Sequence, residues 1–272
     1  MTGAQDPRAL LRTLEQRARK RFGQHFLARP SVCTRMVRNA GLENGSRALE
    51  IGPGLGILTE AMLAVGAEVT AIEIDDDLAE RTREVYPDVR LIHADAVRTD
   101  LAEVCEGTGW TMCANLPYNV GTMLVMNAAR APQTFRRIVV MLQAEVVHRM
   151  AAGPGSKTYG ALSVELGVRG RVQPLFGVPP KSFVPPPRVD STVVRVDLFE
   201  APRTGRTSPD DFDRMVRAAF SQRRKTLPNA LAAAFGKDRA TAALQAVGLD
   251  VRARAETVSV EGFVALGEAL YE

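Results

Sequence analysis

RALEIGPGLG, residues 47–56, decides the fold class. The run RALEIG is short, largely apolar and stopped by glycine, which is typical of a buried parallel strand. Gly52, Gly54 and Gly56 then precede the helical spacing of residues 57–66. Glycines at such a place permit a tight turn and let the backbone approach a ligand closely at a helix N-terminus. The stretch therefore predicts a strand, a ligand-binding turn and a helix in succession.

Strands and helices alternate on both sides of this stretch. The expected strands are residues 47–52, 68–74, 89–95, 111–116 and 137–142, and the expected helices are residues 30–41, 57–66 and 76–86. This rhythm predicts an α/β fold with a doubly wound, Rossmann-like and mostly parallel sheet. Residues 191–199 alternate between apolar and polar side chains, so we expect a late strand there, joined to the sheet antiparallel.

The C-terminal part of the chain has a different character. VPPKSFVPPPRVDS, residues 178–191, holds five prolines, so we expect an extended loop. A polar connector around residues 201–208 marks the predicted domain boundary. Helical patterns follow at residues 209–222, 228–235, 238–247 and 259–270. We therefore predict a main domain over residues 1–201 and a small all-helical C-terminal domain over residues 202–272.

The composition is that of a soluble globular protein. Of the 272 residues, 46% are hydrophobic and 24% are charged, which argues against a disordered or collagen-like chain. No uninterrupted apolar run has spanning length and no apolar segment follows the basic N-terminus, so we expect neither a membrane anchor nor a secretory signal. The three cysteines form no CxxC pair, and the three histidines show no metal spacing. We expect a reducing cytoplasm and no metal site.

Basic side chains gather in two segments. Residues 1–30 hold seven basic and two acidic side chains, and residues 203–225 hold seven basic and three acidic ones, although the net charge is only +4. This clustering favours a polyanionic partner such as nucleic acid, although solvated helix faces give the same pattern. Arginine suits phosphate contact because its guanidinium binds bidentately. The candidate RNA contacts are Arg19, Lys20, Arg21, Arg223, Arg224 and Lys225.

Glu73 and Asp95 are candidate contacts for a nucleoside-bearing cofactor. Glu73 ends the second expected strand, where a carboxylate can accept hydrogen bonds from both ribose hydroxyls. Asp95 ends the third, where it can accept from an adenine amino group or simply cap a helix. His93, on the same strand, is expected to be a buried core residue. Because the glycine spacing is GxGxG and not GxGxxG, NAD and S-adenosyl-L-methionine (SAM) both remain open at this point.

NLPY, residues 115–118, follows the fourth expected strand and favours transfer of a methyl group to an amine. An adenine amino group is a poor nucleophile because its lone pair is delocalised into the ring. The side-chain carbonyl of Asn115 and the backbone carbonyl of Leu116, whose direction Pro117 restricts, can hold its two N–H groups. Tyr118 offers a face on which the base can stack. In-line positioning of the amine, the methyl group and the sulfur would supply a large part of the barrier reduction, without a metal or a covalent nucleophile.

The chain resembles the ribosomal RNA adenine dimethyltransferases of the KsgA type. NLPY is similar to the Asn/Asp/Ser-Pro-Pro-Tyr/Phe motif of amino-methyltransferases. The other matching stretches are RFGQHFL (21–27), ALEIGPGLGILTEAML (48–63), IEIDDDL (72–78), ANLPYNVGT (114–122), MLQAEVVHRMAAGPGSKTYGALSV (141–164), PPKSFVPPPRVDSTVVR (179–195) and AFSQRRKTLPNAL (219–231). The resemblance implies a SAM-dependent methyltransferase that forms N6,N6-dimethyladenosine at two adjacent adenosines near the 3′ end of small-subunit (16S) rRNA during ribosome assembly, releasing S-adenosylhomocysteine.

The resemblance also implies roles for individual residues. The implied cofactor contacts are His25, Leu27, Gly52, Glu73, Asp95 and Asn115, to which the glycine turn adds Gly54 and Gly56. Phe183, in KSFVPPP, would sandwich the target base opposite Tyr118. Relatives more often show NIST where this chain has NVGT at residues 119–122, and we expect Gly121 to loosen that loop. The implied partner is the immature small ribosomal subunit, and we expect a monomer because no self-complementary apolar stripe is evident.

Two other functions compete with this hypothesis. An Erm-type methylase of large-subunit rRNA shares the fold, although NLPY and the PPKSFVPPPRVDS stretch favour the small subunit. A non-catalytic RNA-binding assembly factor, or a mitochondrial-type transcription factor, would keep the fold without activity. Intact Glu73, Asp95 and NLPY argue against that loss.

Overall fold

The computed structural model describes residues 25–222 and 224–272, which form two compact units. The first unit comprises the described residues up to Val147 together with Gln173–Leu198, and the second comprises His148–Val172 and Phe199–Glu272. Within the described residues, no helix combines the length and the apolar character needed to cross a bilayer.

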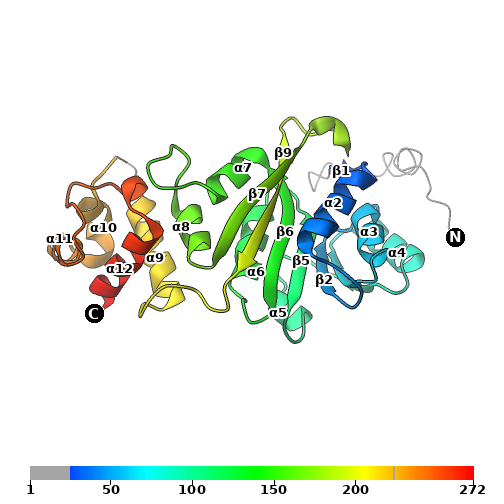
Figure 1. The fold of residues 1–272 in the computed structure, drawn as a ribbon, viewed down its shortest axis with the longest axis horizontal. Helices are drawn as coiled ribbons and strands as arrows, with labels where there is room; N and C mark the ends of the chain where they lie inside the picture. The colour runs from blue at the N-terminus through cyan, green and yellow to red at the C-terminus, as the bar shows by residue number, and fades with distance from the viewer. Residues whose placement is uncertain (1–24, 223) are drawn as a thin grey trace. The chain divides into compact units, whose positions relative to one another are not determined.

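A seven-stranded sheet in the order β4-β3-β2-β5-β6-β9-β7 contains the strands that carry the site (Figure 1). The strands are β2 (Arg47–Ile51), β3 (Glu68–Glu73), β4 (Arg90–His93), β5 (Trp110–Asn115), β6 (Phe135–Gln143), β7 (Gly170–Val178) and β9 (Ser191–Leu198). Strands β2 to β6 pair in parallel, whereas β9 pairs antiparallel with β6. The predicted mostly parallel sheet with a late antiparallel strand is confirmed. Strand β7, which sequence analysis missed, carries Pro174 at the edge of the sheet, where proline is tolerated.

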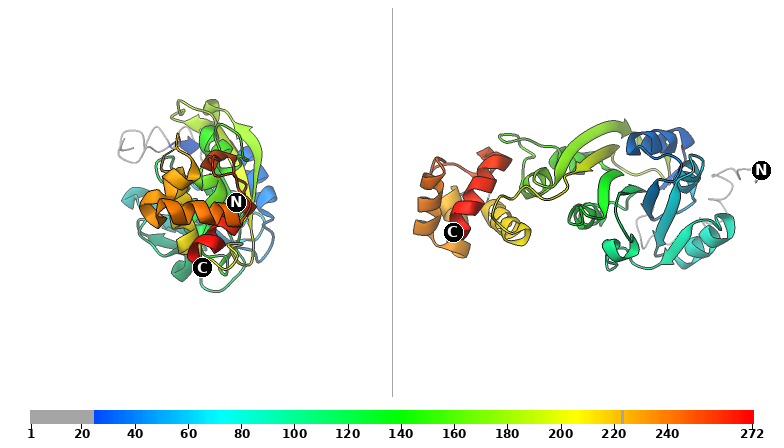
Figure 2. Two further views of the ribbon diagram at one scale, coloured as in Figure 1. Left: turned by 90° about the vertical axis from the view of Figure 1, so that its left-hand side faces the viewer. Right: turned by 60° about the horizontal axis from the view of Figure 1, so that its bottom comes forward.

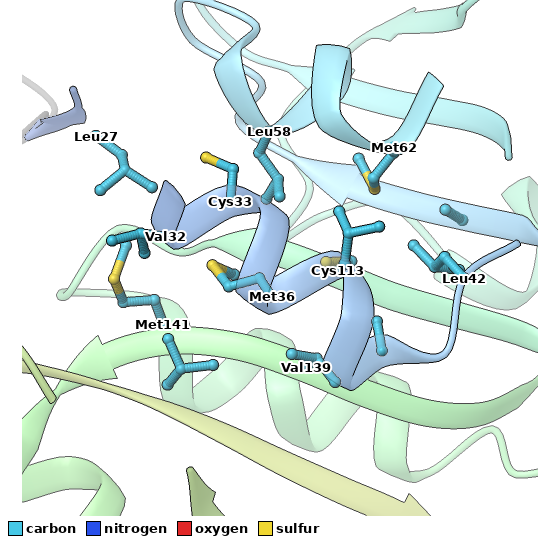
Figure 3. Close-up of a cluster of buried hydrophobic side chains, with 14 of the residues drawn as sticks. Leu27, Val32, Cys33, Met36, Leu42, Leu58, Met62, Cys113, Val139 and Met141 are labelled. Carbon is cyan, nitrogen blue, oxygen red and sulfur yellow. The ribbon is translucent and has the colours of Figure 1, made fainter. Parts of the chain in front are cut away.

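The first unit has helices α2 (Pro30–Ala40), α3 (Ile57–Leu63), α4 (Asp76–Val85), α5 (Leu101–Val104) and α6 (Gly121–Ala129), and shares α7 (Ala144–Met150) with the second. Helix α2 ends where Gly41 adopts a φ of 65° and donates its N–H to the carbonyls of Arg38 and Val37. In Figure 3, Cys33 and Met36 of α2 lie among side chains of α3 and of strands β5 and β6. Burial raises the pKa of Cys33 to about 12, so this thiol is a neutral core residue and not a nucleophile.

Residues 26–27 and 183–184 form a separate two-stranded antiparallel sheet. In it β1 (Phe26–Leu27) pairs with β8 (Phe183–Val184), with Leu27 opposite Phe183. The proline-rich stretch predicted as an extended loop therefore contains a short strand, preceded by the 3-10 turn Pro180–Ser182. This pairing attaches the proline-rich stretch to the segment that precedes α2.

The second unit is helical. Its helices are α8 (Ala161–Gly167), α9 (Pro209–Phe220), α10 (Leu227–Phe235), α11 (Lys237–Ala246) and α12 (Val260–Tyr271), and α9 to α12 gather together in both views of Figure 2. Ser208 caps α9 by accepting the N–H of Asp211. Fully buried side chains from all five of these helices, among them Phe212, Leu231 and Phe263, form its core.

The division between the units differs from the predicted boundary. The predicted boundary lies between residues 201 and 202, whereas the compact units divide after Leu198 and residues 148–172 belong to the helical unit. Packing explains the difference, because Tyr159 and Val164 lie in the helical core. A buried ion pair also joins residues 148–172 to α9, with Arg169 Nη1 2.9 Å from Asp213 Oδ1.

Candidate active site

A cavity of about 410 Å³ opens at the carboxyl ends of β2, β3 and β5. The chain runs from β2 outward to β3 and β4 and then returns to the other side of β2 with β5. This change of direction is a topological switch point, the place where open α/β sheets bind ligands. The cavity has a size typical of small-molecule sites. Ten of the predicted site residues line it, namely His25, Leu27, Gly52, Gly54, Glu73, Asp95, Asn115, Leu116, Pro117 and Tyr118.

The glycine-rich turn after β2 has the conformation that its sequence predicts. Gly52, Gly54 and Gly56 have φ values of 68°, 57° and 83°, a region that side-chain-bearing residues rarely adopt. A Cβ on Gly56 would lie 2.2 Å from Cε2 of Tyr86, so this glycine serves close packing and does not line the cavity. A Cβ on Gly52 would have no neighbour within 4 Å, because this residue faces the open cavity.

Glu73 is held at the end of β3 by backbone N–H groups. Its Oε1 accepts from Ile74 at 2.9 Å and from Asp75 at 3.0 Å, and its Oε2 accepts from Gly54 at 3.3 Å. Burial raises the pKa of Glu73, while these three hydrogen bonds oppose the rise. A carboxylate has about four acceptor positions, so Oε2 keeps capacity for a ligand hydroxyl. The structure thus places Glu73 as predicted and orients it toward the glycine turn.

Glu50 is a cavity residue that the sequence analysis missed. It is only 2% exposed at the end of β2, and Thr59 Oγ1 donates to its Oε2 at 2.6 Å. Burial raises its pKa to about 8, with a further contribution from the charge of Glu73. An acidic residue inside the otherwise apolar run RALEIG was the signal that could have found it.

Asp95 caps a turn and not a helix, and its predicted contact with an adenine amino group stays a prediction. Its Oδ1 accepts the N–H of Val97 at 2.9 Å, as a capping residue would, and the residue also lines the cavity. Arg98 lies nearby, with Nε 3.6 Å from Oδ2. The prediction for His93 is wrong, because β4 is an edge strand and this side chain is 38% exposed, 3.0 Å from Asp76.

The side-chain amide of Asn115 has a defined orientation. Its Nδ2 donates to the backbone carbonyl of His25 at 3.2 Å. Since a carbonyl can only accept, the NH₂ group must lie on that side and Oδ1 is left as the acceptor. His25 is held in turn by a hydrogen bond of 2.8 Å from its Nδ1 to the carbonyl of Pro185. The segment before α2 therefore orients the amide at the end of β5.

Further hydrogen bonds fix the position of the NLPY segment. The N–H of Leu116 donates to the carbonyl of Met141 at 3.3 Å, and the carbonyl of Pro117 accepts from the N–H of Gly121 at 2.9 Å. The hydroxyl of Tyr118 lies 2.6 Å from Ser191 Oγ, and burial raises the pKa of this tyrosine. Its ring lies 5.7 Å from the ring of His25, centroid to centroid. Gly121 does not loosen the loop as expected, because it is buried and begins α6.

The structure does not place Phe183 in the cavity. This side chain is 2% exposed and belongs to the core cluster that contains Leu27 and Val193. Its partnership with Tyr118 around a base remains a proposal that requires the ring to leave this position.

The predicted RNA contacts are only partly described. Arg224 and Lys225 are exposed after α9, whereas Arg19, Lys20, Arg21 and Arg223 lie outside the described residues. In the part of the chain that the structure describes, no cluster of three or more His, Cys, Asp or Glu side chains could hold a metal ion.

Comparisons with known proteins identify the family to which the chain is similar. The family model described as ribosomal RNA adenine dimethylase matches residues 15–271. The ribosomal RNA small subunit methyltransferase A of Bordetella bronchiseptica is 44% identical over 93% of this chain and 94% of its own length. The protein of the same name from Thermosynechococcus vestitus is 40% identical over 93% of this chain and 97% of its own.

Two solved structures share the fold. A dimethyladenosine transferase from Plasmodium falciparum has a TM-score of 0.76 at 25% identity and covers 89% of this chain and 96% of its own. The 23S rRNA methyltransferase ErmE has a TM-score of 0.70 at 23% identity and covers 91% of this chain and 100% of its own.

Proposed function

Because the chain belongs to the ribosomal RNA adenine dimethylase family, we propose that its cavity binds SAM and that NLPY receives the N6 amino group of adenosines in small-subunit rRNA. The family establishes the enzyme class, which is SAM-dependent adenine dimethylation of rRNA. One observation carries the assignment of the site. The amide of Asn115 is turned by the His25 carbonyl so that its oxygen is the free acceptor beside the cavity.

The residues around the cavity fit SAM. The open space at Gly52 leaves room for a ligand against the backbone of the turn. We propose that Glu73 accepts a ribose hydroxyl through Oε2 and that Asp95 accepts from the adenine amino group of the cofactor. When bound, SAM supplies an electrophilic methyl group on a sulfonium. The protein's own contribution is to hold the acceptor amine in line with that methyl group.

Two carbonyls prepare the amine. Asn115 Oδ1 and the Leu116 carbonyl would each accept one N–H of the target amino group, which withdraws the nitrogen lone pair from the ring and directs it at the methyl group. Tyr118 would stack on the base, an interaction worth about 1–3 kcal/mol per base. After transfer the cationic amine loses a proton to solvent and S-adenosylhomocysteine leaves. The methylamino group keeps one N–H, which one of the two carbonyls would accept while a second molecule of SAM supplies the second methyl group.

We assign the small subunit as the source of the RNA on the strength of the relatives. They carry that name at 40–44% identity over more than nine tenths of both chains, whereas the large-subunit enzyme ErmE shares the fold at 23% identity. We further propose two adjacent adenosines of an immature particle as the substrate, and a cytoplasmic monomer as the active form. Arg224 and Lys225 are exposed and available for phosphate contact.

The test is transfer of labelled methyl from SAM to small subunits lacking dimethyladenosine, with large subunits in parallel. We expect label in small-subunit rRNA alone. Replacing Asn115 with Ala should lower kcat by roughly 10²–10³, the usual cost of one lost transition-state hydrogen bond, while SAM affinity changes little. Asn39→Ala is the matched control, because that exposed amide donates to the Arg35 carbonyl within α2. Equal labelling of large subunits, or an Asn115→Ala enzyme as fast as the wild type, contradicts the proposal.

A further inference from the structure

Gly121 is a glycine for reasons of space and not of backbone conformation. It is buried at the first position of α6, and its φ lies outside the left-handed region. Its N–H donates to the carbonyl of Pro117, so the residue is attached directly to NLPY. A side chain at this position would therefore be allowed by the backbone, and something else must exclude it.

Leu142 occupies the volume that a side chain at position 121 would need. A Cβ built on Gly121 would lie 2.2 Å from Cδ2 of Leu142 and 3.3 Å from Cβ of Leu116. Leu142 is 1% exposed on β6, where it pairs with Thr192 of β9, so it is surrounded by packed core and cannot swing into solvent. Adding even one methyl group would force Leu142, Leu116 or the start of α6 to move.

We propose that Gly121 and Leu142 are positioning residues that set the place of the Leu116 carbonyl. The inference rests on the proposed function of NLPY as the amine acceptor. Leu116 is attached to β6 through its N–H on Met141, the neighbour of Leu142 in sequence. It is attached to α6 through Pro117, whose carbonyl takes the N–H of Gly121. A change in side-chain size at Gly121 or at Leu142 would therefore shift the Leu116 carbonyl relative to the line that joins the target amine to the methyl group.

The test is a cycle of three variants, Gly121→Ala, Leu142→Ala and the double variant, measured by single-turnover methyl transfer. Gly121→Ala should lower the transfer rate about tenfold or more, since a displacement near 1 Å can cost roughly a hundredfold, while the affinity for S-adenosylhomocysteine stays within about twofold. Leu142→Ala should also be slow because it empties the volume beside Gly121 at the start of α6. The double variant should be faster than Gly121→Ala, because the added methyl group enters the vacated volume.

Gly267→Ala is the control for lost stability alone. Gly267 is a buried helical glycine of the second unit whose added Cβ would lie 3.1 Å from Thr207 Oγ1. The Gly267→Ala variant should unfold at a lower temperature than the wild type and keep the wild-type rate of methyl transfer. Wild-type transfer by Gly121→Ala overturns the inference, as does a double variant no faster than Gly121→Ala, or a parallel loss of rate, cofactor affinity and stability.

The proposed function and this inference fail separately. If the wild type methylates large-subunit and not small-subunit rRNA, the proposed substrate is wrong, and the same cycle is run on the RNA it accepts. An experimental structure of Gly121→Ala in which the Leu116 carbonyl has not moved overturns the inference whichever RNA is the substrate.

Discussion

Replacing Glu50 with Gln should make the first unit more stable at neutral pH and leave it nearly unchanged in acid. Burial raises the pKa of Glu50 from 4.5 to about 8, so the folded protein keeps this carboxyl protonated where the unfolded chain has released the proton. Stability then falls as pH rises from 4.5 to 8, with a slope of about 1.4 kcal/mol per pH unit. At pH 7 the cost is roughly 3 kcal/mol by the same conversion. Gln has nearly the same shape, can accept the Thr59 hydrogen bond and does not titrate.

The assay is urea unfolding between pH 5 and 8, followed by tryptophan fluorescence. The chain has one tryptophan, Trp110, which is buried on β5, so its signal reports the first unit without interference from the second. The difference in unfolding free energy between Glu50→Gln and wild type should be small at pH 5 and should grow to about 3 kcal/mol at pH 7. Glu60→Gln, on the exposed face of α3, is the control and should show no such growth. Parallel pH dependences for wild type and Glu50→Gln would refute the reasoning.

Two further outcomes are expected. Asp213→Ala should destabilise the helical unit by about 3–5 kcal/mol in thermal unfolding, because Arg169 would be left as a buried charge without this partner. Asp210→Ala, at an exposed position, should change the melting temperature little. Equal melting temperatures for the two variants would contradict this prediction. Tyr118→Phe should keep most methyl transfer, because the hydroxyl that it removes contacts Ser191 and the ring that stacks on the base remains. Tyr118→Ala should lose about 1–3 kcal/mol of stacking, measured as a lower kcat/KM for rRNA. Identical losses in the two variants would rule out stacking.

Local patterns predicted β2 to β6 and β9 because each of these strands carries its own signal, whereas β1, β7 and β8 were not predicted. RALEIG, the second strand ending at Glu73 and the alternating strand at residues 191–199 were all found, since burial on one or both faces dictates their apolar residues. Helix α6 was missed because it is apolar around most of its surface, which removes the helical period from its sequence. His93 was misjudged for a related reason, because a local pattern does not reveal that β4 lies at the edge of the sheet.

The orientation of the site residues escaped prediction because it depends on contacts between residues far apart in the sequence. NLPY predicted which residues would hold the target amine, but the orientation of Asn115 comes from the carbonyl of His25, ninety positions away in the chain. The position of His25 depends in turn on Pro185, through the pairing of β1 with β8. Gly121 illustrates the same limit. A glycine in the sequence suggests a flexible loop, whereas in the structure the side chain of Leu142 fills the volume next to it. The chemistry proposed for this site therefore follows from its motifs, whereas its geometry depends on the pairs of residues that the fold brings together.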